Sequence, residues 1–81
     1  MKAEEIMTNL RAVFDDLFEG YGDAISEQTT AQDIEEWDSL TNIELMVAVE
    51  EKFNVKFTAA DVSQLQNVGD LVRLVENKTA A

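Results

Sequence analysis

The sequence predicts an all-α protein: a four-helix bundle with a long loop between the first and second helices and a short third helix. Three observations lead to this prediction. Apolar residues recur at spacings of three and four in separate segments, which is the period of an amphipathic helix. No alternating apolar run is long enough for a sheet. The 81 residues contain no proline and suffice for one small core, so we predict a single domain over residues 1–81.

A first amphipathic helix is predicted over residues 3–19. Its apolar residues share one helix face, and they are Ile6, Leu10, Val13, Phe14, Leu17 and Phe18. Gly20 and Gly22 follow and are expected to end the helix, because glycine is favoured just beyond a helix terminus.

Residues 21–36 are polar and follow neither a helical nor a strand period. We expect a long ordered loop here, held to the core by Ile25 and Ile34. A connection of this length is unusual in so small a domain, and long loops of this kind are often functional.

The second helix is predicted over residues 39–53 and is expected to be the central one. Its apolar stripe is wide enough to predict burial on more than one side, and it comprises Leu40, Ile43, Met46, Val47, Val49 and Phe53. A short extended connector over residues 54–57 follows it.

Two further helices are predicted, a short one over residues 59–65 and a last one over residues 68–78. Thr58 and Asp61 have the spacing of a capping box at the start of the short helix. Asn67 or a neighbour is expected to cap the last helix, whose apolar face comprises Leu71, Val72, Leu74 and Val75. Thr79 and the two alanines after it are expected to fray.

The composition excludes several classes of function. The chain has no cysteine and no histidine, so disulfides, the usual zinc sites and thiolate or imidazole catalysis are ruled out. We therefore predict no catalytic residue and no metal site. No apolar run approaches the roughly 20 residues of a membrane span, and the first residues are too acidic to begin a signal peptide. These features predict a cytoplasmic protein without membrane insertion.

The net charge of -11 is unevenly distributed along the chain. No Lys or Arg occurs between Arg11 and Lys52, whereas 12 of the 17 acidic residues lie there. Such a surface repels phosphate backbones and anionic membranes, which excludes nucleic acid as a partner and favours proteins with basic docking patches. Solubility alone is the competing explanation for this charge.

Ser39 lies at or next to the N-cap of the predicted second helix. Serine and aspartate are favoured there because their oxygens accept hydrogen bonds from free amides, so Ser39 could serve only as a cap. The same position also suits an anion, since the free amides and the helix dipole favour negative charge. No histidine or nearby lysine could activate the hydroxyl, which indicates a serine that is modified by another enzyme and not a catalytic one.

The stretch that begins with Asp38-Ser39-Leu40 resembles the signature of acyl carrier proteins. The similarity includes Glu44-Leu45 and Glu50-Glu51 on the same helix, and it extends over about residues 3–78. The resemblance implies a four-helix bundle that is a monomer and not an enzyme. It also implies that Ser39 receives 4'-phosphopantetheine from coenzyme A through a phosphopantetheinyl transferase, and that the thiol of this arm holds acyl groups as thioesters.

The resemblance further implies a partner face and an acyl pocket. Acyl-transferring, condensing or synthetase enzymes with basic patches would recognise Glu44, Val47, Glu50 and Glu51. Asp38 would cap the helix and contribute to transferase recognition, and Leu40 would pack beneath the arm. An acyl chain would enter between the second and third helices, in a pocket formed by Met46, Val49, Phe53, Phe57, Val62 and Leu65.

Six residues depart from the pattern of housekeeping fatty-acid carriers, and three of them, Lys52, Lys56 and Ala59, weaken the acidic surface beyond Glu51. The other three lie around the serine. Trp37 replaces a small residue, Thr41 replaces an acid and Glu36 replaces a common glycine. These differences predict a specialised carrier for a dedicated lipid, polyketide or related pathway. Trp37 is expected either to pack over the end of the bundle or to discriminate between partners.

Two other functions stay open on the sequence. The cargo could be an aminoacyl group, as in D-alanyl or peptidyl carriers, which share the serine-bearing helix. The chain could also be an unmodified acidic helical module for protein interaction, in which Ser39 is only a cap.

Overall fold

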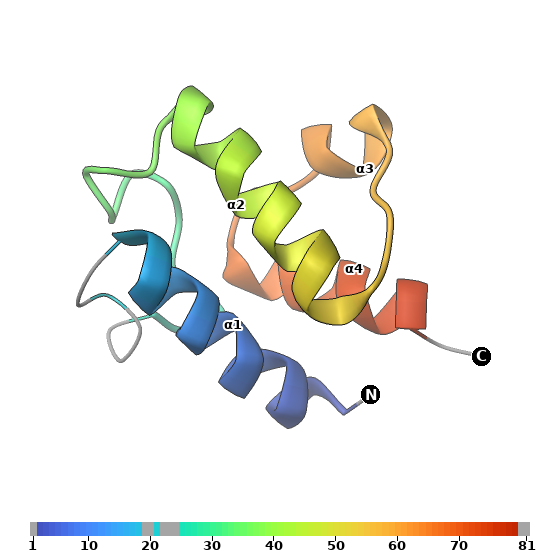
Figure 1. Cartoon of the computed structure of the whole chain (residues 1–81). Helices are drawn as coiled ribbons and strands as arrows, with labels where there is room; N and C mark the ends of the chain where they lie inside the picture. Colours follow the sequence, from blue (N-terminus) through green and yellow to red (C-terminus); the bar gives the residue numbers. More distant parts are fainter. Residues whose placement is uncertain (1, 19–20, 22–24, 80–81) are drawn as a thin grey trace.

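The computed structural model describes residues 2–18, 21 and 25–79, and this part of the chain is all-helical. Its four helices are α1 (Ala3–Phe18), α2 (Ser39–Phe53), α3 (Ala59–Ser63) and α4 (Val68–Thr79). α1 runs opposite to both α2 and α4, and the short α3 lies beyond the end of the connector from α2 (Figure 1). The predicted all-α fold is therefore confirmed. Among the described residues, no helix is both long and apolar enough to cross a membrane.

α1 forms one side of the core with the predicted apolar face. Ile6, Leu10 and Phe14 are completely buried, and Leu17 is the one predicted face residue that is only partly buried. α1 is described as far as Phe18. The predicted last residue 19 and the predicted stop at Gly20 and Gly22 lie outside the described residues.

The loop before α2 is attached to the core and to the start of α4. Ile25 and Ile34 are each 2% exposed, which confirms the two predicted anchors. The amide of Val68 donates to the carbonyl of Thr29 at 2.9 Å, and the amide of Gly69 donates to the carbonyl of Glu27 at 2.8 Å. A Cβ atom at position 69 would lie 3.0 Å from that Glu27 oxygen, so the close approach of the loop favours glycine. These bonds use amides at the start of α4 that have no partner within the helix.

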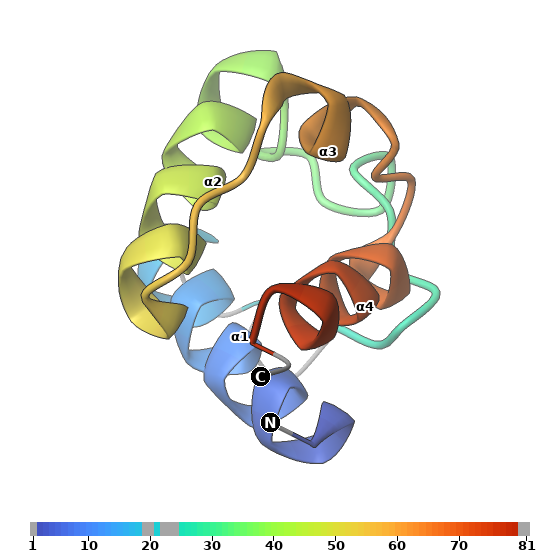
Figure 2. The same ribbon diagram turned by 90° about the vertical axis from the view of Figure 1, so that its right-hand side faces the viewer.

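α2 buries only one side, so the predicted burial of its whole apolar stripe is wrong. Its buried residues are Leu45, Met46, Val49 and Phe53. Leu40, Ile43 and Val47 are instead 70%, 64% and 48% exposed. The physical reason is the arrangement of the helices, because α1 covers one face of α2 (Figure 2), whereas Ile43 and Val47 lie beside an open hollow between α2 and α3.

α3 is shorter than predicted and ends at Ser63 instead of residue 65. Beyond it, the amide of Leu65 donates to the carbonyl of Val62 at 3.2 Å, a tighter turn that does not continue the α-helix. The predicted capping box is present: Thr58 Oγ1 accepts from the Asp61 amide at 3.0 Å and Asp61 Oδ2 accepts from the Thr58 amide at 2.9 Å. No residue of α3 is fully buried.

An ion pair joins α3 to α4, since Lys78 Nζ lies 2.9 Å from Asp61 Oδ2. The amide of Thr58, which donates to the same carboxylate, is the main cause that holds the pKa of Asp61 below its ordinary value, and the bond from Lys78 contributes next. Polar contacts at its ends and the partly buried Val62, which packs against the core, together hold α3 in place.

α4 begins after the predicted cap, because Asn67 Oδ1 accepts from the amide of Asp70 at 2.8 Å. The helix continues to Thr79, one residue beyond the predicted end, so the predicted fraying of Thr79 is wrong. The Thr79 hydroxyl donates to the carbonyl of Val75 at 2.8 Å, which ties this residue to the preceding turn. The final two alanines lie outside the described residues.

Candidate functional site

The start of α2 is fixed by Asp38, which is the N-cap residue. Asp38 Oδ1 accepts from the amides of Leu40 at 2.9 Å and Thr41 at 3.0 Å. Ser39 is the first residue of the helix proper, next to the cap, and its side chain is exposed. Because Asp38 already accepts from two of the free amides at the start of α2, the hydroxyl of Ser39 is not needed as a cap.

Thr41 completes a capping box with Asp38. Its hydroxyl accepts from the Asp38 amide at 2.8 Å and donates to the Glu36 carbonyl at 2.6 Å. A capping box usually has Glu or Gln at this position, and here threonine makes the reciprocal bond. The departure at Thr41 therefore has a structural explanation in the turn that leads into α2.

The hydrogen bond from the Thr41 amide, with those from the Leu40 amide and the Thr41 hydroxyl, lowers the pKa of Asp38 below its ordinary value of 3.8. A carboxyl with a lowered pKa in the folded state stabilises the fold above its ordinary pKa, and this contribution is lost as the pH falls through the lowered pKa. We expect the melting temperature to decrease as the pH falls below about 3.8, and the decrease to be smaller in Asp38→Asn. Thermal melts monitored by circular dichroism from pH 6 to pH 2 measure both. An acid decrease of equal size in the two proteins would contradict this assignment.

Trp37 packs over the end of the bundle, which is one of the two roles that the sequence predicted for it. Its ring meets Phe14 edge-on at a centroid distance of 5.3 Å and lies 6.3 Å from the ring of Phe18. Its indole Nε1 donates to Asn42 Oδ1 at 2.9 Å. Trp37 is therefore held by apolar contacts on one side and by a hydrogen bond to α2 on the other.

A hollow of about 270 Å³ opens directly beside Ser39, between α2 and the segment that joins α3 to α4. It is lined by Ala31, Trp37, Asp38, Ser39, Asn42, Met46, Val62, Leu65, Gln66, Asn67 and Leu71. The predicted pocket residues Met46, Val62 and Leu65 are among these. Apolar side chains and carboxamides thus share one lining next to the serine.

A second hollow, of about 390 Å³, lies between α2 and α3, with Phe57, Ile43 and Val47 in its lining. Asn42, Met46 and Val62 line both hollows and so stand between them. Val49 and Phe53, which the sequence also assigned to a pocket, line neither hollow; they are 0% and 8% exposed and belong to the core.

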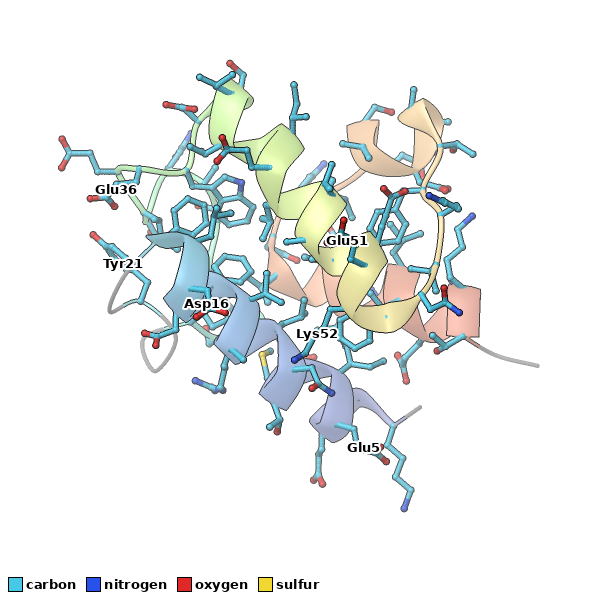
Figure 3. The ribbon with its side chains drawn as sticks, viewed as in Figure 1. Glu5, Asp16, Tyr21, Glu36, Glu51 and Lys52 are labelled. Carbon is cyan, nitrogen blue, oxygen red and sulfur yellow. The ribbon has the colours of Figure 1, made fainter. Side chains whose placement is uncertain are left out.

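The outer face of α2 combines apolar and acidic side chains. Leu40, Ile43 and Val47 are the exposed large apolar residues of the described chain, and we call them the α2 strip. Glu44 and Glu51 are exposed beside it. Figure 3 shows Glu51 on the last turns of α2, next to Lys52. Leu40 therefore points outward, and Ile43 is a surface residue that the sequence reasoning placed in the core. Its spacing of three after Leu40 and four before Val47 was the signal that could have identified it.

Glu50 differs from the other predicted partner residues. It is only partly exposed, and its Oε2 accepts from the amide of Phe57 at 2.7 Å. The carboxylate thereby ties the connector between α2 and α3 to the last turns of α2. The structure thus places Glu50 in a structural contact, whereas Glu44 and Glu51 face outward.

Glu50→Ala is expected to lower the free energy of unfolding by about 1–3 kcal/mol, because a hydrogen bond to a charged group is lost and the Phe57 amide loses its partner. Glu51→Ala is the matched control, and its change should stay within about 0.5 kcal/mol, since it alters an exposed side chain. Urea denaturation of both variants measures the difference. Equal stability of the two variants would show that the bond to Phe57 contributes nothing.

Another departure, Glu36, lies beside Tyr21 at the loop (Figure 3). The negative charge of Glu36 raises the pKa of Tyr21 above its ordinary value of 10.0, with a smaller contribution from Glu35. The phenol therefore stays neutral at physiological pH. This pair lies in the loop and does not contribute to the lining of the hollow beside Ser39.

Comparison with known proteins agrees with this arrangement. The family model described as the phosphopantetheine attachment site matches residues 22–75. An acyl carrier protein of Acidothermus cellulolyticus is 31% identical over 100% of this chain and 96% of its own. One of Thermosynechococcus vestitus is 32% identical, with 100% of both chains covered.

A solved structure is also similar to the whole fold. The solution NMR structure of holo acyl carrier protein from Geobacter metallireducens superposes with a TM-score of 0.82 at 35% identity, covering 89% of this chain and 83% of that one. The chain therefore belongs to the acyl carrier protein family, whose members carry acyl groups on a covalently attached 4'-phosphopantetheine and are not catalysts.

Proposed function

We propose that Ser39 is the residue that carries the phosphopantetheine arm. The observation that supports this most directly is its position: an exposed hydroxyl on the first residue of α2, which is not used for capping and which borders the hollow. The start of a helix also favours the negative charge of a phosphodiester. In the transfer, a separate transferase forms the bond between Ser39 Oγ and phosphorus and breaks the pyrophosphate bond of coenzyme A. Adenosine 3',5'-bisphosphate leaves and the hydroxyl proton is removed.

The residues beside Ser39 fit such an arm. The arm contains amide groups and methyl groups, and the lining offers carboxamides at Asn42, Gln66 and Asn67 together with apolar side chains such as Met46 and Leu65. Once attached, the arm supplies the thiol that this cysteine-free chain lacks. Ser39 provides the attachment, and the hollow provides a surface on which the arm and part of its cargo can be sheltered.

We infer that the α2 strip, with Glu44 and Glu51 beside it, is the surface read by partner enzymes. An apolar centre with charged residues at the rim is typical of protein interfaces, and the acids favour enzymes with basic patches. The proposed partners are the phosphopantetheinyl transferase and acyl-transferring, condensing or synthetase enzymes. Brief one-to-one encounters of this kind suit a monomeric carrier, which we place in the cytoplasm.

We further propose a specialised lipid or polyketide pathway and not the main route of fatty-acid synthesis. Since the capping box explains Thr41, Trp37 is the departure that supports this proposal, because its large side chain lines the hollow at a position where housekeeping carriers have a small residue. A strain that lacks its main fatty-acid carrier should not grow when it expresses this chain instead. Full rescue of growth would overturn the pathway proposal and leave the attachment proposal intact.

Intact-mass spectrometry tests the proposed attachment. Incubation with coenzyme A and a promiscuous phosphopantetheinyl transferase is expected to add the mass of a single arm to each chain. No gain in mass would overturn the proposal and would favour an unmodified interaction module. Loading the holo protein with acyl or aminoacyl donors then identifies the class of cargo, and exclusive aminoacyl loading would exclude an acyl carrier.

A further inference from the structure

Asn42 holds an unused hydrogen-bond donor at the hollow beside Ser39. Its Oδ1 accepts from the indole Nε1 of Trp37 at 2.9 Å, which fixes the orientation of the carboxamide because only the oxygen can accept. Within residues 2–18, 21 and 25–79, Asn42 Nδ2 has no acceptor. The donor therefore sits on a side chain that lines both the hollow beside Ser39 and the hollow between α2 and α3.

The position of Asn42 on α2 limits which ligand atom it can reach. Asn42 follows Ser39 by three residues, so the two side chains lie on the same face of the helix, with Asn42 about 4.5 Å further along the axis. An arm attached to Ser39 and lying in the hollow passes this carboxamide soon after its phosphate. The oxygens that come within reach belong to the first part of the arm, which holds its hydroxyl and the first of its two amide carbonyls, and not to the thiol end.

Trp37 keeps this carboxamide in place. Its ring is held edge-on against Phe14 and lies close to Phe18, so the indole is fixed by the core and cannot follow the ligand. A carboxamide already oriented by such a neighbour loses little freedom when it binds, and pre-orientation of this kind strengthens binding. Both polar atoms of the Asn42 carboxamide then have defined directions: Oδ1 points toward Trp37, and Nδ2 is available to a ligand.

We propose that Asn42 is a positioning residue for the arm: its Nδ2 donates a hydrogen bond to an amide carbonyl oxygen of the arm on Ser39, with Trp37 orienting the carboxamide. This inference rests on the proposed attachment at Ser39. The bond holds the arm against the hollow, so that a partner enzyme must break it to draw the arm out. The Trp37–Asn42 pair thus sets the balance between a docked and an extended arm.

Nuclear magnetic resonance of the uniformly 15N-labelled holo protein tests this proposal. In the wild type, the Asn42 side-chain amide signals should shift between the apo and holo forms and show nuclear Overhauser contacts to the arm. Asn42→Asp retains the acceptor for Trp37 but has no donor, and Asn42→Leu removes the donor without adding charge. Both are expected to reduce the docked fraction relative to the extended one by about fivefold, the factor for one neutral hydrogen bond.

Two further variants separate this role from a structural one. Trp37→Phe keeps a ring against Phe14 but removes the indole donor, and it should reduce docking while the fold remains intact. Asn77→Leu alters an exposed carboxamide on α4 away from the hollow and should leave docking unchanged. Asn42 amide signals that do not move on conversion to the holo form, or a docked fraction unchanged in both Asn42 variants, would overturn the proposal. In either of these outcomes the gain in mass still supports attachment at Ser39, whereas failure of attachment itself shows as no gain in mass.

Discussion

Ser39→Ala is expected to abolish the gain in mass completely while changing the free energy of unfolding by no more than about 0.5 kcal/mol. The first effect is total because the alanine has no oxygen to accept the arm. The second is small because Asp38, and not Ser39, accepts from the amides of Leu40 and Thr41. Intact-mass spectrometry after incubation with the transferase measures the first effect, and urea denaturation of the apo protein measures the second.

Ser63→Ala is the matched control for this variant. Ser63 is also an exposed serine, and its hydroxyl donates to the carbonyl of Ala60 at 2.9 Å on α3. The control should gain the full mass of the arm. An arm on the Ser39→Ala protein would show that another residue is modified. A loss of about 1 kcal/mol or more in Ser39→Ala would show that its hydroxyl contributes to the cap after all.

Phe14→Ala is expected to have the largest effect on stability, a loss of about 3–5 kcal/mol in the free energy of unfolding. The ring of Phe14 is completely buried and lies 5.6 Å from that of Phe18 and 5.3 Å from that of Trp37. Its removal leaves a cavity at the end of the bundle. Because native proteins have a free energy of unfolding of only about 5–15 kcal/mol, this substitution is expected to remove much of the stability of the fold. Urea denaturation measures the loss in the free energy of unfolding. The fluorescence emission of Trp37, the single tryptophan of the chain, reports the change in packing at the end of the bundle.

Phe57→Ala serves as the comparison, because this ring is only partly buried on the connector and lines the second hollow. Its loss of stability should be clearly smaller than that of Phe14→Ala. If the two losses were equal, the buried ring of Phe14 would contribute no more to stability than the partly buried ring of Phe57. A loss below about 1 kcal/mol in Phe14→Ala would contradict the structure directly.

Several elements could be predicted from local sequence because their causes are local. The Thr58–Asp61 capping box and the Asn67 cap depend on side chains bonding to amides three residues away, and both form as predicted. The anchoring of the long loop by Ile25 and Ile34 was also predictable, because isolated apolar residues in a polar segment have a core as their natural environment. The end of α3 at Ser63 was not, since the tighter turn at Leu65 follows from how the chain must turn into α4.

The site divides in the same way. The resemblance carried by Asp38-Ser39-Leu40 and the acids that follow predicted the family, which the comparisons confirm. The attachment at Ser39 stays a proposal, and the sequence could suggest it because the start of a helix is a local structure. The helical period did not predict which apolar residues of α2 are buried. It places residues on common faces, but it does not indicate which face another helix covers. Only the packing of α1 on one side of α2 left Leu40, Ile43 and Val47 exposed.

The chain by itself thus determined four helices, their caps and the serine at the start of α2, because hydrogen bonds and apolar spacing act over a few residues. The tertiary structure alone decided that Glu50 binds the Phe57 amide, that Trp37 orients Asn42, and that a hollow opens beside Ser39. The hydrogen bond between Glu50 and Phe57 and the hollow both depend on the positions of the connector and α3. The orientation of the Trp37 indole depends on its packing against α1. The spacing of apolar residues along the chain does not predict these contacts, because they form only when separate helices pack around one core.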